Sequence, residues 1–135
     1  MNTVKAEVII IDDYAQNRLM LEMMLYRWEA ELQISEAENA APVFDMIQQS
    51  PCQNILLLLD LQMPVMDGYA FLDAWQQQKS TVTKNVTIVV VSTTPMAKFK
   101  LRPQFGLQDG YLEKPVSETE FTNVINSYLK HIKEV

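Results

Sequence analysis

The chain has 135 residues and a mass of 15.5 kDa, which is the size of a single domain. A hydrophobic fraction of 48% and a charged fraction of 21% argue against disorder, and a net charge of −6 argues against direct binding to nucleic acid or anionic membranes. The longest aliphatic run, Ile55–Leu59, is too short to span a bilayer, and the single cysteine, Cys52, excludes an internal disulfide, so we expect one cytoplasmic domain over residues 1–135.

Short β-forming runs alternate with helix-like segments along the chain, and three of the runs are continuously apolar. In chain order the predicted elements are a strand at Val8–Ile11, a helix at Ala15–Trp28, a strand at Gln33–Ala37, a helix at Ala41–Gln49, a strand at Ile55–Leu59, a helix at Gly68–Gln78, a strand at Ile88–Val91, a helix at Met96–Gln104, a strand at Gly110–Leu112 and a helix at Ser117–Ile132. Continuously apolar strands are typical of a parallel sheet covered by helices on both faces. The pattern therefore predicts a doubly wound α/β fold of three layers, with five βα units.

The last two predicted helices differ in the strength of their signals. Ser117–Ile132 repeats its apolar residues with helical spacing and begins with a capping box, in which Ser117 and Glu120 satisfy free backbone amides. In Met96–Gln104, Pro95 can open a helix, but Pro103 must end or distort it.

Polar residues follow four of the predicted strands. Asp12 and Asp13 come after the first strand, Asp60 after the third, Ser92 after the fourth and Lys114 just after the fifth. The carboxyl ends of parallel strands form one edge of the sheet, so we expect these side chains to converge there. Crowded carboxylates repel one another unless a cation neutralises them, and Mg²⁺ prefers such oxygen ligands. A carboxylate can attack phosphorus, and a lysine and a hydroxyl suit the phosphoryl oxygens, so the set indicates Mg²⁺-assisted phosphoryl transfer onto an aspartate.

The sequence resembles the response-regulator receiver domains of two-component signalling. Four motifs carry the resemblance: IIIDD at 9–13, LDLQMPVMDG at 59–68, VVVST at 89–93 and GYLEKP at 110–115. They occur in the family's order at the expected strand ends, and the resemblance extends from about Val4 to Ile132. It implies a CheY-like, flavodoxin-like fold with a five-stranded parallel sheet of order 2-1-3-4-5.

The resemblance also implies a role for each matching acidic residue. Asp60 would be the phosphoacceptor. Asp13 would bind Mg²⁺ directly and Asp12 through water, while the Asp60 carboxylate and the backbone carbonyl of Gln62 would complete the protein's share of the ligands. No other cofactor is implied.

Further implied roles concern the phosphoryl group and the response to it. Ser92 would hydrogen-bond a phosphoryl oxygen, Lys114 would pair with the group, and Tyr111 stands at the family's aromatic switch position. The Lys114–Pro115 bond is usually cis in this family. Thr93 departs from the usual alanine, and we expect it to crowd the path of the Tyr111 ring.

By resemblance, the chain is a signalling switch and not an enzyme acting on an external substrate. A histidine kinase or a histidine phosphotransfer protein would supply the phosphoryl group, and phosphorylation would alter binding to an output protein that the sequence does not name. The chain ends three residues after Ile132, so we expect a stand-alone receiver without an output domain. A receiver excised from a longer regulator or hybrid kinase would look the same. A phosphorylation-dependent dimer through the fourth helix, fifth strand and fifth helix is also compatible.

Other functions remain open at this point. A flavodoxin-like redox module shares the sheet order, but Asp12 and Asp13 would repel the FMN phosphate. An aspartyl-phosphate phosphatase would carry Asp-x-Asp after the first strand, where the acids here are adjacent. A degenerate receiver would bind partners without being phosphorylated. Taken singly, the acidic pair is also compatible with helix capping, and Asp60 with a turn residue.

Overall fold

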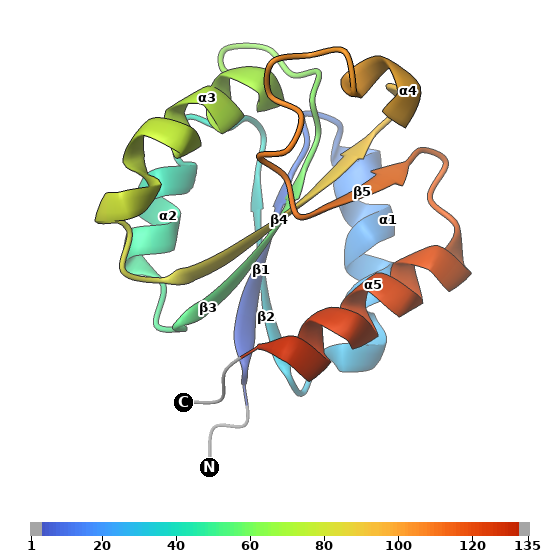
Figure 1. Cartoon of the computed structure of the whole chain (residues 1–135). Coiled ribbons are helices and arrows are strands. Elements are labelled where there is room, and N and C mark those ends of the chain that lie inside the picture. Colours follow the sequence, from blue (N-terminus) through green and yellow to red (C-terminus); the bar gives the residue numbers. More distant parts are fainter. Residues whose placement is uncertain (1–3, 133–135) are drawn as a thin grey trace.

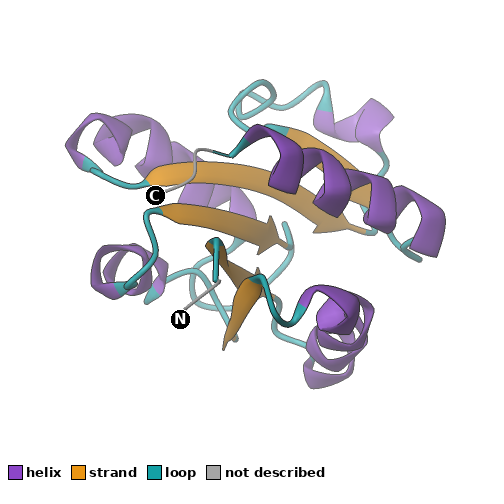
Figure 2. Ribbon diagram, turned by 90° about the horizontal axis from the view of Figure 1, so that it is seen from below, coloured by secondary structure: helices purple, strands orange, loops and turns teal. Residues whose placement is uncertain are grey.

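The computed structural model describes residues 4–132, which form a five-stranded parallel sheet with helices on both faces (Figures 1 and 2). The strand order is β2-β1-β3-β4-β5, as the resemblance implies. The strands are β1 (Ala6–Ile11), β2 (Leu32–Ala37), β3 (Asn54–Leu59), β4 (Asn85–Ser92) and β5 (Gly110–Glu113). In the part of the chain that the structure describes, no helix has the length and apolar character needed to cross a membrane.

The two central strands, β1 and β3, are buried along their whole length. Helices cover both faces of these strands, which explains why their sequences are apolar without alternation. The pairing places Ile11 opposite Leu59, and the amide of Asp60 donates to the carbonyl of Ile11 at 3.0 Å. The register therefore brings the residues that follow the two strands, Asp12 and Asp60, next to each other.

The helices divide between the two faces of the sheet, as Figure 2 shows. Buried side chains of α1 and α5 pack on one face, and those of α2, α3 and α4 pack on the other. The helical segments are α1 (Ala15–Leu25), the 3₁₀ turn η1 (Tyr26–Trp28), α2 (Val43–Gln49), α3 (Gly68–Gln78), the 3₁₀ turn η2 (Lys79–Thr81), α4 (Met96–Phe99) and α5 (Glu118–His131).

The helix predicted at Met96–Gln104 is wrong in its extent, because α4 ends at Phe99 and turns follow it. Two physical causes account for the early end. Pro103 disfavours the α conformation of the residue before it and has no N–H to donate. Leu101 is 85% exposed, so the turn after Phe99 has no apolar stripe to hold it on the sheet.

The two edge strands differ from the buried central pair. The β2 strand exposes Gln33 and Glu36 to solvent, and β5 is only four residues long. The sheet therefore has three interior strands, β1, β3 and β4, and a polar strand and a short strand at its edges.

Candidate functional site

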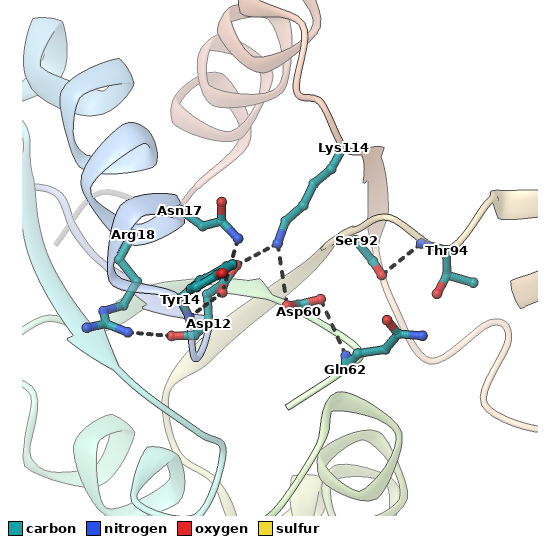
Figure 3. Close-up of polar contacts among 9 residues, drawn as sticks. All are labelled: Asp12, Tyr14, Asn17, Arg18, Asp60, Gln62, Ser92, Thr94 and Lys114. Atoms are coloured by element: carbon teal, nitrogen blue, oxygen red, sulfur yellow. Dashed lines mark hydrogen bonds and ion pairs between the residues drawn. The ribbon is translucent and has the colours of Figure 1, made fainter. Parts of the chain in front are cut away.

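Three carboxylates gather at the carboxyl ends of β1 and β3, and Figure 3 shows two of them, Asp12 and Asp60. Asp12 and Asp60 are buried, whereas Asp13 is exposed, and one oxygen from each of the three carboxylates lies within 4.8 Å of the others. The expectation that these acids converge at one sheet edge agrees with this geometry.

Lys114 reaches the same cluster from the end of β5. Its ammonium lies 2.6 Å from Asp12 Oδ2 and 3.4 Å from Asp60 Oδ2 (Figure 3). Its backbone amide donates to the Ser92 carbonyl at 2.8 Å, which fixes the lysine beside the end of β4. The Lys114–Pro115 peptide is cis, as the resemblance implies.

Burial is the main influence on the ionisation of Asp60. Removal from water raises the pKa of the Asp60 carboxyl, and the nearby Asp12 charge raises it further. The Lys114 ammonium acts in the opposite direction without outweighing the burial. An ionised Asp60 is therefore incompletely compensated within the protein, and a further cation would stabilise it.

The acidic loop after β1 is tied to the start of α1. Asp12 Oδ1 accepts a hydrogen bond from the Tyr14 amide at 2.9 Å, and the Asp12 carbonyl accepts one from Arg18 Nη1 at 2.7 Å (Figure 3). The Asn17 side-chain amide also approaches Asp12 Oδ1, at 3.5 Å. The N-cap residue of α1 is Tyr14, which has no side-chain capping bond, so Asp12 forms a local turn before the helix and also pairs with Lys114.

The loop between β3 and α3 passes very close to Asp60. A Cβ atom at Gly68 would lie 2.3 Å from the backbone oxygen of Asp60, so only glycine fits this position. The Met66 amide donates to the Pro64 carbonyl at 2.8 Å across Val65, whose φ is +69°. Such a γ-turn is strained for a β-branched residue. The loop is thus held against the backbone of Asp60 by a conformation that few sequences tolerate.

Ser92 and Tyr111 both contact the backbone of Thr94. The Ser92 hydroxyl accepts a hydrogen bond from the Thr94 amide at 3.1 Å (Figure 3), and the Tyr111 hydroxyl donates to the Thr94 carbonyl. The Tyr111 ring packs on Phe99 of α4 with a centroid distance of 5.3 Å, and burial raises the pKa of Tyr111 to about 12. Thr93 is exposed. Its expected crowding of the Tyr111 ring stays a prediction.

A cavity of about 480 Å³ opens to solvent over the acidic cluster. Its lining includes the predicted residues Asp13, Asp60, Gln62, Thr93 and Lys114, together with Tyr14, Asn17, Met20 and Pro115. A larger cavity of about 630 Å³ lies between α5 and the amino ends of β3 and β4, and it contains none of the three clustered carboxylates. The smaller cavity is therefore the candidate functional site.

Three residues important to this geometry escaped the sequence prediction. Asn17 and Arg18 lie one helical turn after Tyr14, which is the only sequence signal that they face the strand end. Gly68 stood out only as a turn glycine, because its close approach to Asp60 depends on tertiary structure.

The donor chemistry of the cluster fits a hard divalent cation. All three side chains offer carboxylate oxygens, which Mg²⁺ prefers over nitrogen or sulfur. Within residues 4–132, no hydrogen bond or ion pair engages the Asp13 carboxylate, and its side chain lines the cavity. The cluster can hold a metal ion on the solvent side of Asp60.

Comparison with known proteins extends this description. The chain matches the model of the response regulator receiver domain over residues 8–126. It is similar to the autoinducer 1 sensor kinase/phosphatase LuxN of Vibrio campbellii, with 31% identity over 130 residues that cover 96% of the chain and 14% of LuxN. It is similar to the sensor protein GacS of Pseudomonas syringae pv. syringae, with 31% identity over 121 residues that cover 87% of the chain and 13% of GacS. The chain thus spans about a seventh of the length of these curated relatives.

Solved structures resemble the chain over nearly its whole length. A CheY-like receiver domain protein from Methanospirillum hungatei has a TM-score of 0.70 and 22% identity, covering 93% of the chain and 94% of that protein. The response regulator TrrA from Thermotoga maritima, in complex with Mg(2+)-BeF, has a TM-score of 0.69 and 17% identity, covering 90% of the chain and 97% of TrrA. At these identities the likenesses show the fold.

Proposed function

Because the chain belongs to the response regulator receiver domain family of two-component signalling, we propose that it accepts a phosphoryl group on Asp60. The observation that carries the proposal is the meeting of Asp60 with Asp12, Asp13 and Lys114 beneath a solvent-open cavity. Members of the family are signalling phosphoacceptors, so the product of the reaction is the modified protein itself.

The chemical step requires a nucleophile and compensation of charge. An Asp60 oxygen forms the new P–O bond while the bond from phosphorus to the donor's imidazole nitrogen breaks, and that nitrogen keeps the electron pair. The Lys114 ammonium, 3.4 Å from Asp60 Oδ2, is suited to pair with a phosphoryl oxygen as it leaves Asp12. Ser92, at the end of β4, would donate its hydroxyl to another phosphoryl oxygen.

We assign the metal site to the carboxylates of Asp12, Asp13 and Asp60 with the backbone carbonyl of Gln62. Mg²⁺ would supply positive charge that offsets repulsion between the carboxylates and the phosphoryl oxygens. Supporting this assignment, the three side chains offer clustered oxygen atoms and the pKa of Asp60 is raised by its burial.

We further propose that Ser92 and Tyr111 report phosphorylation to the surface around α4, β5 and α5. The Ser92 hydroxyl contacts the amide of Thr94 and the Tyr111 hydroxyl contacts its carbonyl, so a shift of Ser92 toward a phosphoryl oxygen would disturb the Tyr111 contact. The Tyr111 ring also packs on Phe99 of α4. The donor would be a cytoplasmic histidine kinase or phosphotransfer protein, and the altered surface would bind an output protein or a second copy.

The test is intact mass after incubation with acetyl phosphate, with Mg²⁺ or with EDTA, for the wild type and for Asp60→Asn. We expect one phosphoryl adduct that requires both Mg²⁺ and Asp60. A wild type without an adduct would favour the degenerate receiver, which binds partners without phosphorylation. An adduct that persists in Asp60→Asn would place the acceptor elsewhere.

A second possibility is that this receiver is part of a longer protein. The lengths of the curated relatives favour it, because the matching region is about a seventh of each sensor protein. In that arrangement this receiver acts within a longer kinase, whereas the main proposal has it act alone over residues 1–135. Immunoblotting of native cell extract separates the two. A band near 15.5 kDa supports the stand-alone receiver, and a much larger band supports the longer kinase.

A further inference from the structure

We propose that Arg18 is a positioning residue, which fixes the peptide between Asp12 and Asp13 and thereby sets the place of the Asp13 carboxylate for cation binding. This inference rests on the proposed function, because it concerns the same metal site. It assigns a role to a residue of α1 that contributes no ligand oxygen of its own.

Asp13 is placed by its backbone and not by a side-chain partner. Among the described residues, nothing hydrogen-bonds or pairs with its carboxylate. The two peptide groups that flank Asp13 are both anchored. The carbonyl on its amino side, that of Asp12, accepts from Arg18 Nη1 at 2.7 Å, and the amide on its carboxyl side, that of Tyr14, donates to Asp12 Oδ1 at 2.9 Å. Arg18 therefore supplies one of the two anchors that fix this residue.

The Arg18 side chain is itself held firmly. Its Nε donates to Glu36 Oε1 at 2.9 Å, its Nη2 lies 3.9 Å from Glu38 Oε1, and only 12% of the side chain is exposed. Glu36 belongs to β2 and lies opposite Ile10 of β1. The guanidinium thus joins the acidic loop to α1 and to the edge of the sheet. Figure 3 shows its contact with Asp12.

The chemistry of this position requires a guanidinium. Its nitrogens point in fixed, different directions, so one can donate a hydrogen bond to a carbonyl while another donates to a carboxylate. A lysine ammonium at the same site is a single point of charge on a flexible stem, so it fixes two separate partners less firmly than the planar guanidinium does. The Arg18→Lys substitution therefore separates positioning from charge.

Positioning and through-space charge predict opposite changes in Mg²⁺ affinity when Arg18 is removed. Arg18 is a cation close to the acidic cluster, so its charge alone weakens the attraction of the cluster for Mg²⁺. If charge were its only influence, removing it would tighten Mg²⁺ binding. If Arg18 positions Asp13, removing it weakens Mg²⁺ binding.

The experiment is calorimetric titration of the metal-free protein with Mg²⁺ for the wild type, Arg18→Met, Arg18→Lys and Arg27→Met. We expect Arg18→Met to raise the Kd about tenfold, as for other residues that orient metal ligands, and Arg18→Lys to restore little of the affinity. Arg27 is the matched control, because its side chain contacts Thr122 and the Trp28 ring, away from the acids. Its substitution should leave the Kd unchanged.

Hydrogen exchange provides a readout without metal, since loss of the anchor should speed exchange of the Tyr14 amide in Arg18→Met. Glu36→Gln, a milder change, should also speed exchange of the Tyr14 amide, a readout that charge alone does not move, and it covers the case in which Arg18→Met does not fold. Unchanged or tighter Mg²⁺ binding in a folded Arg18 variant would overturn the inference. A wild type that binds no Mg²⁺ would instead overturn the metal site of the proposed function.

Discussion

At the scale of single residues, Asp60 is subject to opposing influences of burial and charge. It is 7% exposed, and its ammonium partner, Lys114, lies closer to Asp12 than to Asp60. Folding therefore favours the protonated form of Asp60 and raises its pKa. Above its raised pKa, the ionised Asp60 carboxylate therefore lowers the free energy of unfolding.

Replacement of Asp60 by Asn should therefore raise the melting temperature of the metal-free protein at neutral pH. Because the folded-state pKa is raised, the native state holds the proton more tightly than the unfolded state. The free energy of unfolding of the wild type falls as the pH rises from the ordinary aspartate pKa of about 4 to the raised pKa of Asp60. Above the raised pKa, Asp60 causes no further change. The gain from Asn should vanish below about pH 4.

Thermal melts in EDTA across this pH range measure the effect. Asp45→Asn is the matched control, because Asp45 is an exposed aspartate in the first turn of α2, and its replacement removes the same charge without removing a buried one. A gain in Asp60→Asn that is equal at all pH values would contradict burial of the charge as its cause.

The residues that the sequence could and could not predict differ in a physical way. Asp12, Asp13, Asp60 and Lys114 follow strands, and parallel topology alone brings strand ends together. The contact of Arg18 depends on the reach of one side chain, for which helical spacing is only a weak signal, and that of Gly68 depends on the approach of two backbones. Their importance becomes apparent only when the elements are packed.

At the scale of elements, the helix-capping serine and the apolar stripe predicted for α5 are both present in the structure. The Ser117 hydroxyl accepts from the Glu120 amide at 3.3 Å, and Phe121, Ile125 and Tyr128 are buried along one stripe. The serine half of the predicted capping box is therefore present.

Replacing Ser117 by Ala should lower the free energy of unfolding by about 1 kcal/mol, because the Glu120 amide loses its acceptor at the helix end. Urea denaturation measures the change. Ser127→Ala is the control, since Ser127 is an exposed serine in the interior of the same helix, and its substitution should be neutral or slightly stabilising. Equal losses from both substitutions would show that capping is not the cause.

All five strands and five helices of the described residues 4–132 were predicted, and the largest error in extent is that of α4. The bounds of α3 agree with the prediction, since Asp67 caps the helix by accepting from the Ala70 amide at 2.8 Å. The predicted helix at Ala15–Trp28 corresponds to α1 followed by η1, so its last turn is a 3₁₀ turn instead of an α-helical one. The α4 error arose because a proline fixes where a helix cannot continue, but not where it stops.

At the scale of the whole molecule, a cation at the acidic cluster should stabilise the entire fold. Asp12 and Asp13 follow β1 and Asp60 follows β3, so binding between them joins the two central strands. A ligand that binds only the native state stabilises it by mass action, by about 2.7 kcal/mol at a free concentration 100 times its Kd.

Melts with MgCl₂ should therefore show a higher melting temperature than melts with NaCl of equal ionic strength. The increase should disappear in Asp13→Asn, which removes the exposed carboxylate of the cluster. An equal increase in wild type and Asp13→Asn would indicate a general salt effect.

The polar and short edges of the sheet have a consequence for self-association. An exposed strand edge is a template on which another chain can add a strand, and this is one origin of aggregation. Here the apolar strands β1 and β3 lie inside the sheet together with β4, while the edge strand β2 exposes Gln33 and Glu36 and the edge strand β5 has only four residues. The segments most prone to form fibrils are therefore shielded as long as the sheet is intact, so the native protein should tolerate high concentration, and aggregation should begin from its unfolded state.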